Sequence, residues 1–206
     1  MIIPKTTTKY ESRNQEQYKN IAKILNEIIE IIPGNIAIFF PSYFIMEQIN
    51  EKIDHNIKIT IKEKQNMTKQ EKQDFLEEFK SYKDKGAVLL AVASGSFGEG
   101  IDLPGDYLKA VIIVGLPLNQ PDLETKSLID YFEKKFKKGW DYGYLFPAFN
   151  KTLQNAGRCI RTETDKGIII FLDERYAWQN YKRCFPEDWE IITTTDYKKI
   201  IKDFFD

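Results

Sequence analysis

One continuously apolar run of the chain, residues 87–93, reads AVLLAVA. Such a run is typical of a strand that is covered on both faces, as in a parallel sheet. Four further runs, at 35–40, 57–61, 110–115 and 167–172, also have the composition of strands. Because helical patterns separate these runs, we expect an α/β fold in three layers, with a mainly parallel central sheet flanked by helices.

Amphipathic patterns between the apolar runs predict the helices. Thr68 as N-cap and Glu71 at the third helical position form a capping box in MTKQEKQDFLEEF, which gives one boundary. There is no internal repeat and no convincing linker, so we expect a single domain over residues 1–206. The expected helices cover residues 15–32, 43–53, 68–82, 122–136, 144–161, 177–184 and 197–205.

The composition limits the classes of function. A net charge of −1 and a pI near 6.0 predict no general attraction to nucleic acid, so any such contact depends on local groups. No apolar run approaches the roughly 18–20 residues of a membrane span. We therefore expect a cytoplasmic protein. The Lys-, Ile- and Asn-rich usage indicates a biased genome, and we expect a prokaryotic, archaeal source with association with the nucleoid.

Cysteine and histidine are scarce. Cys159 and Cys184 are too few for a zinc or iron–sulfur ligand set, and a disulfide between them is not expected inside a cell. His55, the only histidine, lies in the polar run EKIDHNIK, where a solvated surface position is expected. We expect no metal site, and Ser-His or Cys-His catalysis is disfavoured.

Only five of the 30 basic residues are arginines, and two of them fall in QNAGRCIR, residues 154–161. On a helix, Gln154, Gly157, Arg158 and Arg161 share one stripe, separate from the apolar residues that would pack on the sheet. Both guanidinium groups would then point off the buried face. A guanidinium offers paired donors that match phosphate oxygens. The alternative is two surface arginines that pair with Glu163 or Asp165.

A glycine-rich loop, SGSFGEGID, follows the apolar run at 87–93. Ligands of open parallel sheets sit at the carboxyl ends of the strands, and glycines allow backbone N–H groups to turn toward an anion. Glu99 and Asp102 can only accept hydrogen bonds, which suits ribose hydroxyls, arginine or a metal. The alternative is a tight connecting loop. The glycine spacing does not fit a dinucleotide-binding motif.

Three segments together resemble motifs IV, V and VI of the XPD/DinG group of superfamily 2 DNA helicases. They are FFPSY, GSFGEGIDLPGDYLKAVIIVGLP and QNAGRCIRTETDKG, with the motifs at about 38–43, 94–103 and 154–161. The segment KYESRNQEQY also resembles the entry to the group's second motor domain. The resemblance covers nearly the whole chain and implies a RecA-like helicase C-terminal domain.

The resemblance implies a role for each matching residue. Arg158 and Arg161 would approach the γ-phosphate of ATP, at least one of them as an arginine finger. Gln154 would orient that helix or contact the nucleotide or its water. Gly157 would permit close approach, while Glu99, Gly100 and Asp102 would couple the nucleotide edge to the arginines. The backbone of single-stranded DNA would be contacted by Ser42, Tyr43, Ser94, Gly95 and Ser96. For Tyr43 we expect packing rather than stacking on a base.

The resemblance also implies partners and cofactors. ATP with Mg²⁺ would be bound mainly by a first motor domain, because the chain has no P-loop of its own. The group's 4Fe–4S cluster belongs to that first domain. The whole enzyme would unwind DNA 5′→3′ in repair, with repair-complex proteins as further partners and no membrane contact. This chain alone would hydrolyse no ATP.

Two other interpretations compete with this one. The first is a non-catalytic α/β binding or scaffold module whose glycine loop holds a phosphate-bearing small molecule. The second is a free-standing nucleotide-dependent enzyme that uses Asp173 and Glu174, which follow the strand at 167–172. We interpret these two acidic residues as surface or interdomain residues. Four lysines at 134, 135, 137 and 138 are expected to form a solvated helix end rather than a DNA track.

Overall fold

Five parallel strands form the central sheet of the chain, in the order β2-β3-β1-β4-β5. The computed structural model describes residues 1–97, 107–118, 121–159 and 166–206. All five expected strands are present, which confirms the fold class. They are β1 (Ile36–Phe40), β2 (Ile59–Lys62), β3 (Ala87–Val92), β4 (Ala110–Val114) and β5 (Ile168–Leu172).

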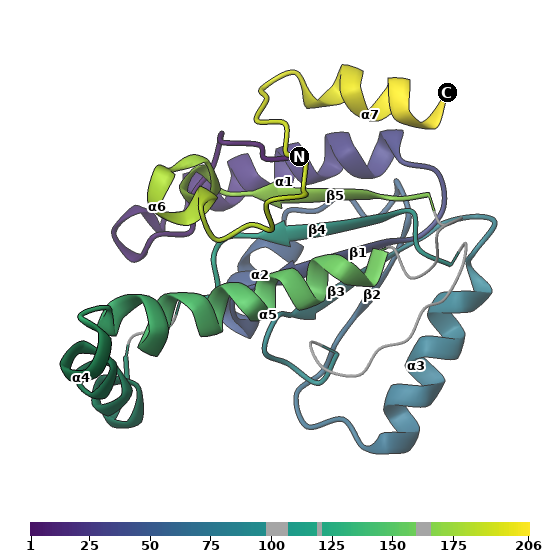
Figure 1. The fold of residues 1–206 in the computed structure, drawn as a ribbon. Helices are drawn as coiled ribbons and strands as arrows, with labels where there is room; N and C mark the ends of the chain where they lie inside the picture. The colour runs from purple at the N-terminus through teal and green to yellow at the C-terminus, as the bar shows by residue number, and fades with distance from the viewer. Residues whose placement is uncertain (98–106, 119–120, 160–165) are drawn as a thin grey trace.

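Helices cover both faces of the sheet, so the domain has three layers (Figure 1). Alternate residues of a strand point to opposite faces. Ile38 of β1 accordingly packs in one core with α1 (Gln15–Ile31), α2 (Tyr43–Asn50) and α7 (Tyr197–Phe205). Phe39 packs in the other core with α3 (Lys69–Ser81) and α5 (Phe146–Ala156). The three central strands are buried along their full length, as their continuously apolar sequences predict.

Side chains at the helix ends explain where several helices begin. The capping box is confirmed: the Thr68 hydroxyl accepts from the Glu71 N–H at 3.2 Å, and the Glu71 carboxylate accepts from the Thr68 N–H at 2.7 Å. At the starts of α1 and α4 (Leu123–Phe136), the side chains of Asn14 and Asp122 accept from the N–H groups of Gln17 and Thr125. Each cap satisfies an N–H group that the first helical turn leaves without a partner.

The helix expected over residues 144–161 is divided into three parts. A π-helical turn at Asp141–Leu145 leads into α5, and a 3₁₀ turn at Gly157–Cys159 follows it. Pro147 lies in the first turn of α5 and has no N–H to continue the preceding turn. Gly157, a poor helix former, ends the α-helical geometry. The expected helix at 177–184 is likewise shorter: α6 spans Gln179–Lys182, after a 3₁₀ turn at Glu174–Ala177.

The N-terminal segment extends the sheet beyond β5, which the sequence did not predict. Ile2 forms parallel bridges with Phe171 of β5 and with Thr193. Its N–H donates to Ile192 O at 2.8 Å, and its carbonyl accepts from Thr194 N at 3.0 Å. The outer edge of β5 is therefore paired, whereas β2 forms the other edge of the sheet.

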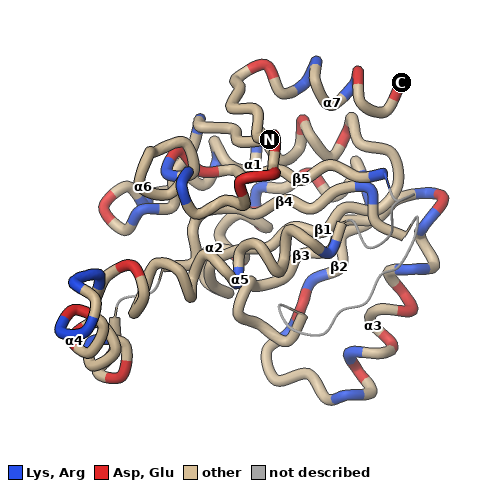
Figure 2. The backbone as a smooth tube through the Cα atoms, viewed as in Figure 1, with Lys and Arg blue, Asp and Glu red and all other residues tan. Residues whose placement is uncertain are grey.

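Charged residues are concentrated on the outer helices rather than on the sheet. Figure 2 shows basic and acidic positions interspersed along α3, α4 and α7, while the strands are mostly uncharged. The α4 helix has no buried residue and stands away from the sheet, at the far end of α5 (Figure 1). The four lysines at its C-terminal end are exposed, as expected of a solvated helix end.

Candidate nucleotide and nucleic-acid site

The carboxyl ends of β1 and β3 place the two predicted DNA-contacting segments side by side. The Ala93 N–H donates to Phe40 O at 2.9 Å, which ties the first residue after β3 to the last residue of β1. Ser42 caps α2, because its hydroxyl accepts from the Ile45 N–H at 3.3 Å. Ser94 is exposed, so this edge presents a hydroxyl to solvent.

A buried carboxylate that sequence reasoning missed organises this edge. Glu63 follows β2 directly and is 1% exposed. Its carboxylate accepts from the Val92 N–H at 2.8 Å, the Phe97 N–H at 3.3 Å and the Tyr43 hydroxyl at 3.0 Å. A Cβ on Gly95 would lie 2.6 Å from one Glu63 oxygen, so the loop closes tightly around the carboxylate. In the sequence, Glu63 is one acidic residue among the polar residues IKEKQN, which gives no signal of burial.

Tyr43 packs inward, as expected, and its neighbour is the exposed aromatic. The Tyr43 ring is partly buried against the core beneath α2. Burial, together with the hydrogen bond to Glu63, raises the pKa of Tyr43 to about 12. Phe44, the next residue, is 63% exposed. The family motif points to Tyr43, whereas the exposure of Phe44 depends on the register of α2 and leaves no signal in the sequence.

The expectation that Arg158 points off the buried face is wrong. Arg158 is 7% exposed, whereas Gln154 is exposed to solvent as expected. The reason is the 3₁₀ turn at Gly157–Cys159, whose tighter winding of three residues per turn rotates Arg158 toward the buried side of α5. Arg158 therefore lies over Asn155, and its Nε donates to Asn155 Oδ1 at 3.5 Å. Asn155 is fully buried, and its amide donates to Ala93 O at 3.1 Å.

The turn that carries Arg158 lies beside the start of β5 rather than at the carboxyl ends of the strands. The Cys159 thiol donates to the carbonyl of Ile168, the first residue of β5, at 3.7 Å. A Cβ on Gly167 would lie 2.3 Å from that sulfur. The α5 helix thus crosses the face of the sheet, and its side chains tilt back toward its N-terminus. This tilt carries Arg158 toward Asn155 and the loop after β3.

Packing among the described residues does not require glycine at position 157. Its φ of −64° is ordinary helical backbone, which any residue can adopt. No heavy atom among the described residues lies within 4 Å of the position that a Cβ would occupy. Gly157 instead borders an open hollow, whose other walls include Met1, the start of β5 and Trp189.

Several predicted site residues lie outside the described residues. These are Glu99, Gly100, Asp102 and Arg161, together with the alternative arginine partners Glu163 and Asp165.

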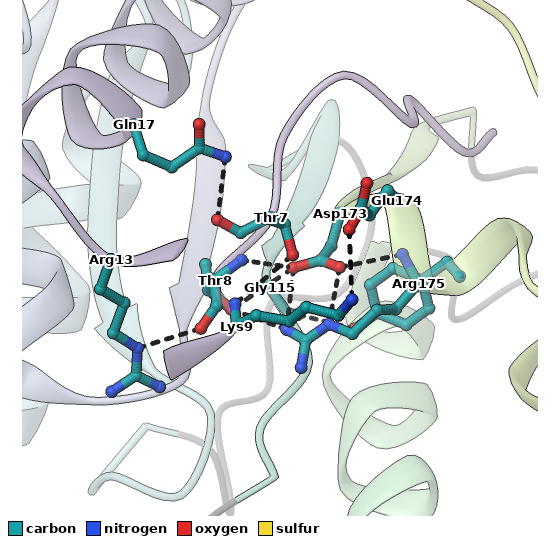
Figure 3. A network of polar contacts seen from close by, with 10 residues as sticks. Thr7, Thr8, Lys9, Arg13, Gln17, Gly115, Asp173, Glu174 and Arg175 are labelled. Carbon is teal, nitrogen blue, oxygen red and sulfur yellow. Dashed lines mark hydrogen bonds and ion pairs between the residues drawn. The ribbon is translucent and has the colours of Figure 1, made fainter. Parts of the chain in front are cut away.

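Asp173 is a buried structural residue, so its interpretation as a surface or interdomain residue is wrong. It is 0% exposed, and its carboxylate accepts from the Thr8 N–H and from Arg175 Nε and Nη2, each at 2.8 Å. Figure 3 shows this network joining the N-terminal segment to the ends of β4 and β5. Gly115 has φ +69° and lies against Thr8, so a Cβ there would clash with the threonine hydroxyl. Glu174 remains half-exposed, 3.7 Å from Lys9 Nζ.

The two cysteines and the histidine take part in no disulfide or metal-binding cluster among the described residues. Cys159 and Cys184 form no disulfide bond, and Cys159 is buried. Two such cysteines do not fit a 4Fe–4S cluster, which needs four thiolates. His55 is exposed. Across the described parts of the chain, no three His, Cys, Asp or Glu side chains gather closely enough to hold a metal ion.

Comparison with known proteins identifies the family. The family of helicase C-terminal domains matches residues 25–191. The chain belongs to this family. Among its relatives, the 3′-5′ exonuclease DinG of Staphylococcus saprophyticus is 31% identical over 197 residues, which cover 92% of this chain and 20% of that protein. The XPD helicase subunit of general transcription and DNA repair factor IIH of Dictyostelium discoideum is 33% identical over 193 residues, covering 88% and 25%.

A solved structure agrees with this assignment. An apo XPD structure superposes with a TM-score of 0.74 at 25% identity, and the match covers 94% of this chain and 39% of that one. This C-terminal domain is therefore a RecA-like helicase motor domain of the XPD/DinG type. The chain spans only a fifth to a quarter of the length of these two relatives. Within the described residues, no helix combines the length and the apolarity that a membrane crossing requires.

Proposed function

We propose that this helicase C-terminal domain is the second motor domain of an ATP-dependent 5′→3′ DNA helicase. Arg158 and Arg161 act as arginine fingers on ATP that a first motor domain binds with Mg²⁺, and Gln154 supports them. Glu99, Gly100, Asp102 and Gly157 complete the nucleotide edge. ATP supplies the phosphoryl group that is transferred to water, and the guanidinium groups stabilise the charge that develops on it.

The open space at Gly157 is the observation that carries this proposal. Neither φ nor packing among the described residues requires glycine there, yet it directly precedes Arg158. A close approach from outside the domain explains the missing side chain. The burial of Arg158 fits this arrangement, because charge-assisted hydrogen bonds to phosphate are strongest where water is excluded.

We further propose that the edge formed by β1 and β3 contacts single-stranded DNA. Ser42, Ser94 and Ser96 contact the phosphate backbone through hydroxyl and N–H groups and Tyr43 through its N–H, without reading sequence. Gly95 shapes the loop, because its own N–H donates to Val92 O at 2.8 Å. Phe44 adds an aromatic face to this edge, on which a base can stack. With a net charge of −1, such contacts depend on this local arrangement rather than on general attraction.

The decisive experiment is Arg158→Lys in the full-length helicase that contains this domain. Lysine keeps the charge but not the planar pair of donors, so we expect DNA-stimulated kcat for ATP hydrolysis to fall by about 10³-fold or more. Arg183→Lys is the matched control, because Arg183 pairs with Asp141 at 2.6 Å on the surface. The isolated 206-residue chain should hydrolyse no ATP.

Equal turnover in the two lysine variants would remove Arg158 from the mechanism. Tight binding of a phosphate-bearing small molecule by the isolated chain, with no effect of Arg158→Lys on turnover, would instead favour a ligand-binding module.

A further inference from the structure

The buried side-chain amide of Asn155 contacts both the residue that precedes the DNA-contacting loop, Ala93, and the proposed arginine finger, Arg158. Asn155 is fully buried on α5. Its Nδ2 donates to Ala93 O at 3.1 Å and to Lys151 O at 2.9 Å. Ala93 directly precedes Ser94, the first residue of the loop that we propose contacts DNA. The second bond holds the amide against its own helix, so Asn155 fastens α5 to the base of that loop.

The other end of the same amide faces the arginine. Because both partners of Nδ2 are carbonyl oxygens, the orientation of the amide is settled and Oδ1 must point the other way. There it accepts from Arg158 Nε at 3.5 Å. An amide group is planar and rigid, so a displacement of Ala93 that rotates Nδ2 also moves Oδ1. The loop after β3 and Arg158 are thus joined by one rigid group.

We propose that Asn155 is a positioning residue that couples DNA binding at the loop after β3 to nucleotide contact at Arg158. The inference rests on the proposed function and adds a residue that the family motif did not single out. DNA bound at Ser94–Ser96 biases the position of Ala93, Asn155 transmits this bias, and Arg158 is held toward the triphosphate. By linkage, nucleotide bound at Arg158 must change the affinity for DNA by the same factor.

Thermodynamic coupling separates this role from a merely structural one. The measurement is the dissociation constant of the full-length helicase for a fluorescent oligothymidylate, with and without ADP–beryllium fluoride. The ratio of the two constants is the coupling factor, which typically lies between about 5 and 150. Loss of stability alone lowers the folded fraction in both measurements and leaves the ratio unchanged.

Three variants make the test specific. Asn155→Ala removes both contacts, and Asn155→Asp keeps the volume and the acceptor for Arg158 but cannot donate to Ala93. Both should reduce the coupling factor to below about twofold, while DNA affinity without nucleotide changes little. Thr152→Val is the matched control, because Thr152 is equally buried on α5 but donates to Ala148 O at 3.3 Å. It should keep the wild-type factor.

The outcomes distinguish the inference from the proposed function. A wild-type protein whose affinity for oligothymidylate does not respond to ADP–beryllium fluoride would overturn both. Wild-type coupling that persists in Asn155→Asp, the variant that preserves packing, would overturn the role of Asn155 alone. Equal loss of coupling in Thr152→Val would also overturn it, since any damage to α5 would then suffice.

Discussion

Two glycines of the candidate site have opposite surroundings. Gly95, in the loop after β3, is enclosed: a Cβ there would lie 2.6 and 2.8 Å from the Glu63 oxygens and 2.9 Å from the Tyr43 hydroxyl. Gly157, in the turn after α5, faces open space among the described residues. The surroundings of glycine therefore differ at these two positions of the site. The described part of the domain encloses the glycine at position 95, whereas none of the described residues packs against position 157.

This difference indicates which part of the site is preformed. Residues 94–97, the described part of the loop after β3, are held by Glu63, a carboxylate of their own domain. At Gly157 the turn borders open space among the described residues, and we propose that the nucleotide-bearing partner approaches there. Substitutions in the first region should therefore change stability, and those in the second should change activity.

The largest stability effect should come from Glu63→Ala. The substitution leaves the buried N–H groups of Val92 and Phe97 without partners, at a cost of about 1–3 kcal/mol for each. We expect the free energy of unfolding of the chain to fall by about 3 kcal/mol, measured by urea denaturation. Glu47→Ala is the control, since Glu47 only pairs with Lys62 on the surface and should cost about 0–1 kcal/mol. Equal losses in the two variants would show that the loop is not held by Glu63.

The two glycines can be compared directly by alanine substitution. Gly95→Ala forces a methyl group against a buried carboxylate and should cost about 1–3 kcal/mol of stability. Gly157→Ala should leave stability unchanged or raise it by about 0.4–1 kcal/mol, because its backbone is helical and unobstructed. In the full-length helicase, Gly157→Ala should nevertheless reduce ATP turnover. Full activity in that variant would mean that nothing approaches the turn closely.

The smallest expected effects are those of substitutions at Tyr43 and Phe44, which should act on different quantities. Tyr43→Phe removes one hydrogen bond to Glu63 and should cost about 1 kcal/mol of stability at neutral pH. Folding raises the pKa of Tyr43 from 10 to about 12. The contribution of the protonated hydroxyl to the free energy of unfolding is therefore complete below pH 10 and is lost as the pH rises through 12. The difference in stability between wild type and Tyr43→Phe should therefore shrink over that range.

Phe44→Ala should behave in the opposite way. Its ring is 63% exposed, so stability should hardly change, while affinity for single-stranded DNA should weaken. Fluorescence anisotropy with an oligothymidylate measures the second quantity. Weaker DNA binding in Tyr43→Phe but not in Phe44→Ala would reverse the assignment of the two aromatic residues.

Local patterns predicted most of the fold, because they depend on nearest neighbours in the chain. The apolar runs of β1, β3 and β4 and the capping box of Thr68 and Glu71 are confirmed. The helix over 144–161 was extended too far, because a hydrophobic period does not report the change to 3₁₀ geometry at Gly157. That change turned Arg158 from the expected outer stripe into a buried position.

The sequence by itself determined the α/β class, the strands, the principal helices and the family motifs. It did so because burial on both faces and helical amphipathicity leave a direct trace in residue order. Only the tertiary structure decided which polar residues are buried: Glu63, Asn155 and Asp173 look like ordinary surface residues in the sequence. In the sequence, Glu63 lies 29 residues from its partner Val92, Asn155 lies 62 residues from Ala93, and Asp173 lies 165 residues from Thr8. A buried polar group is stable only when such distant partners satisfy it, and folding alone brings them together.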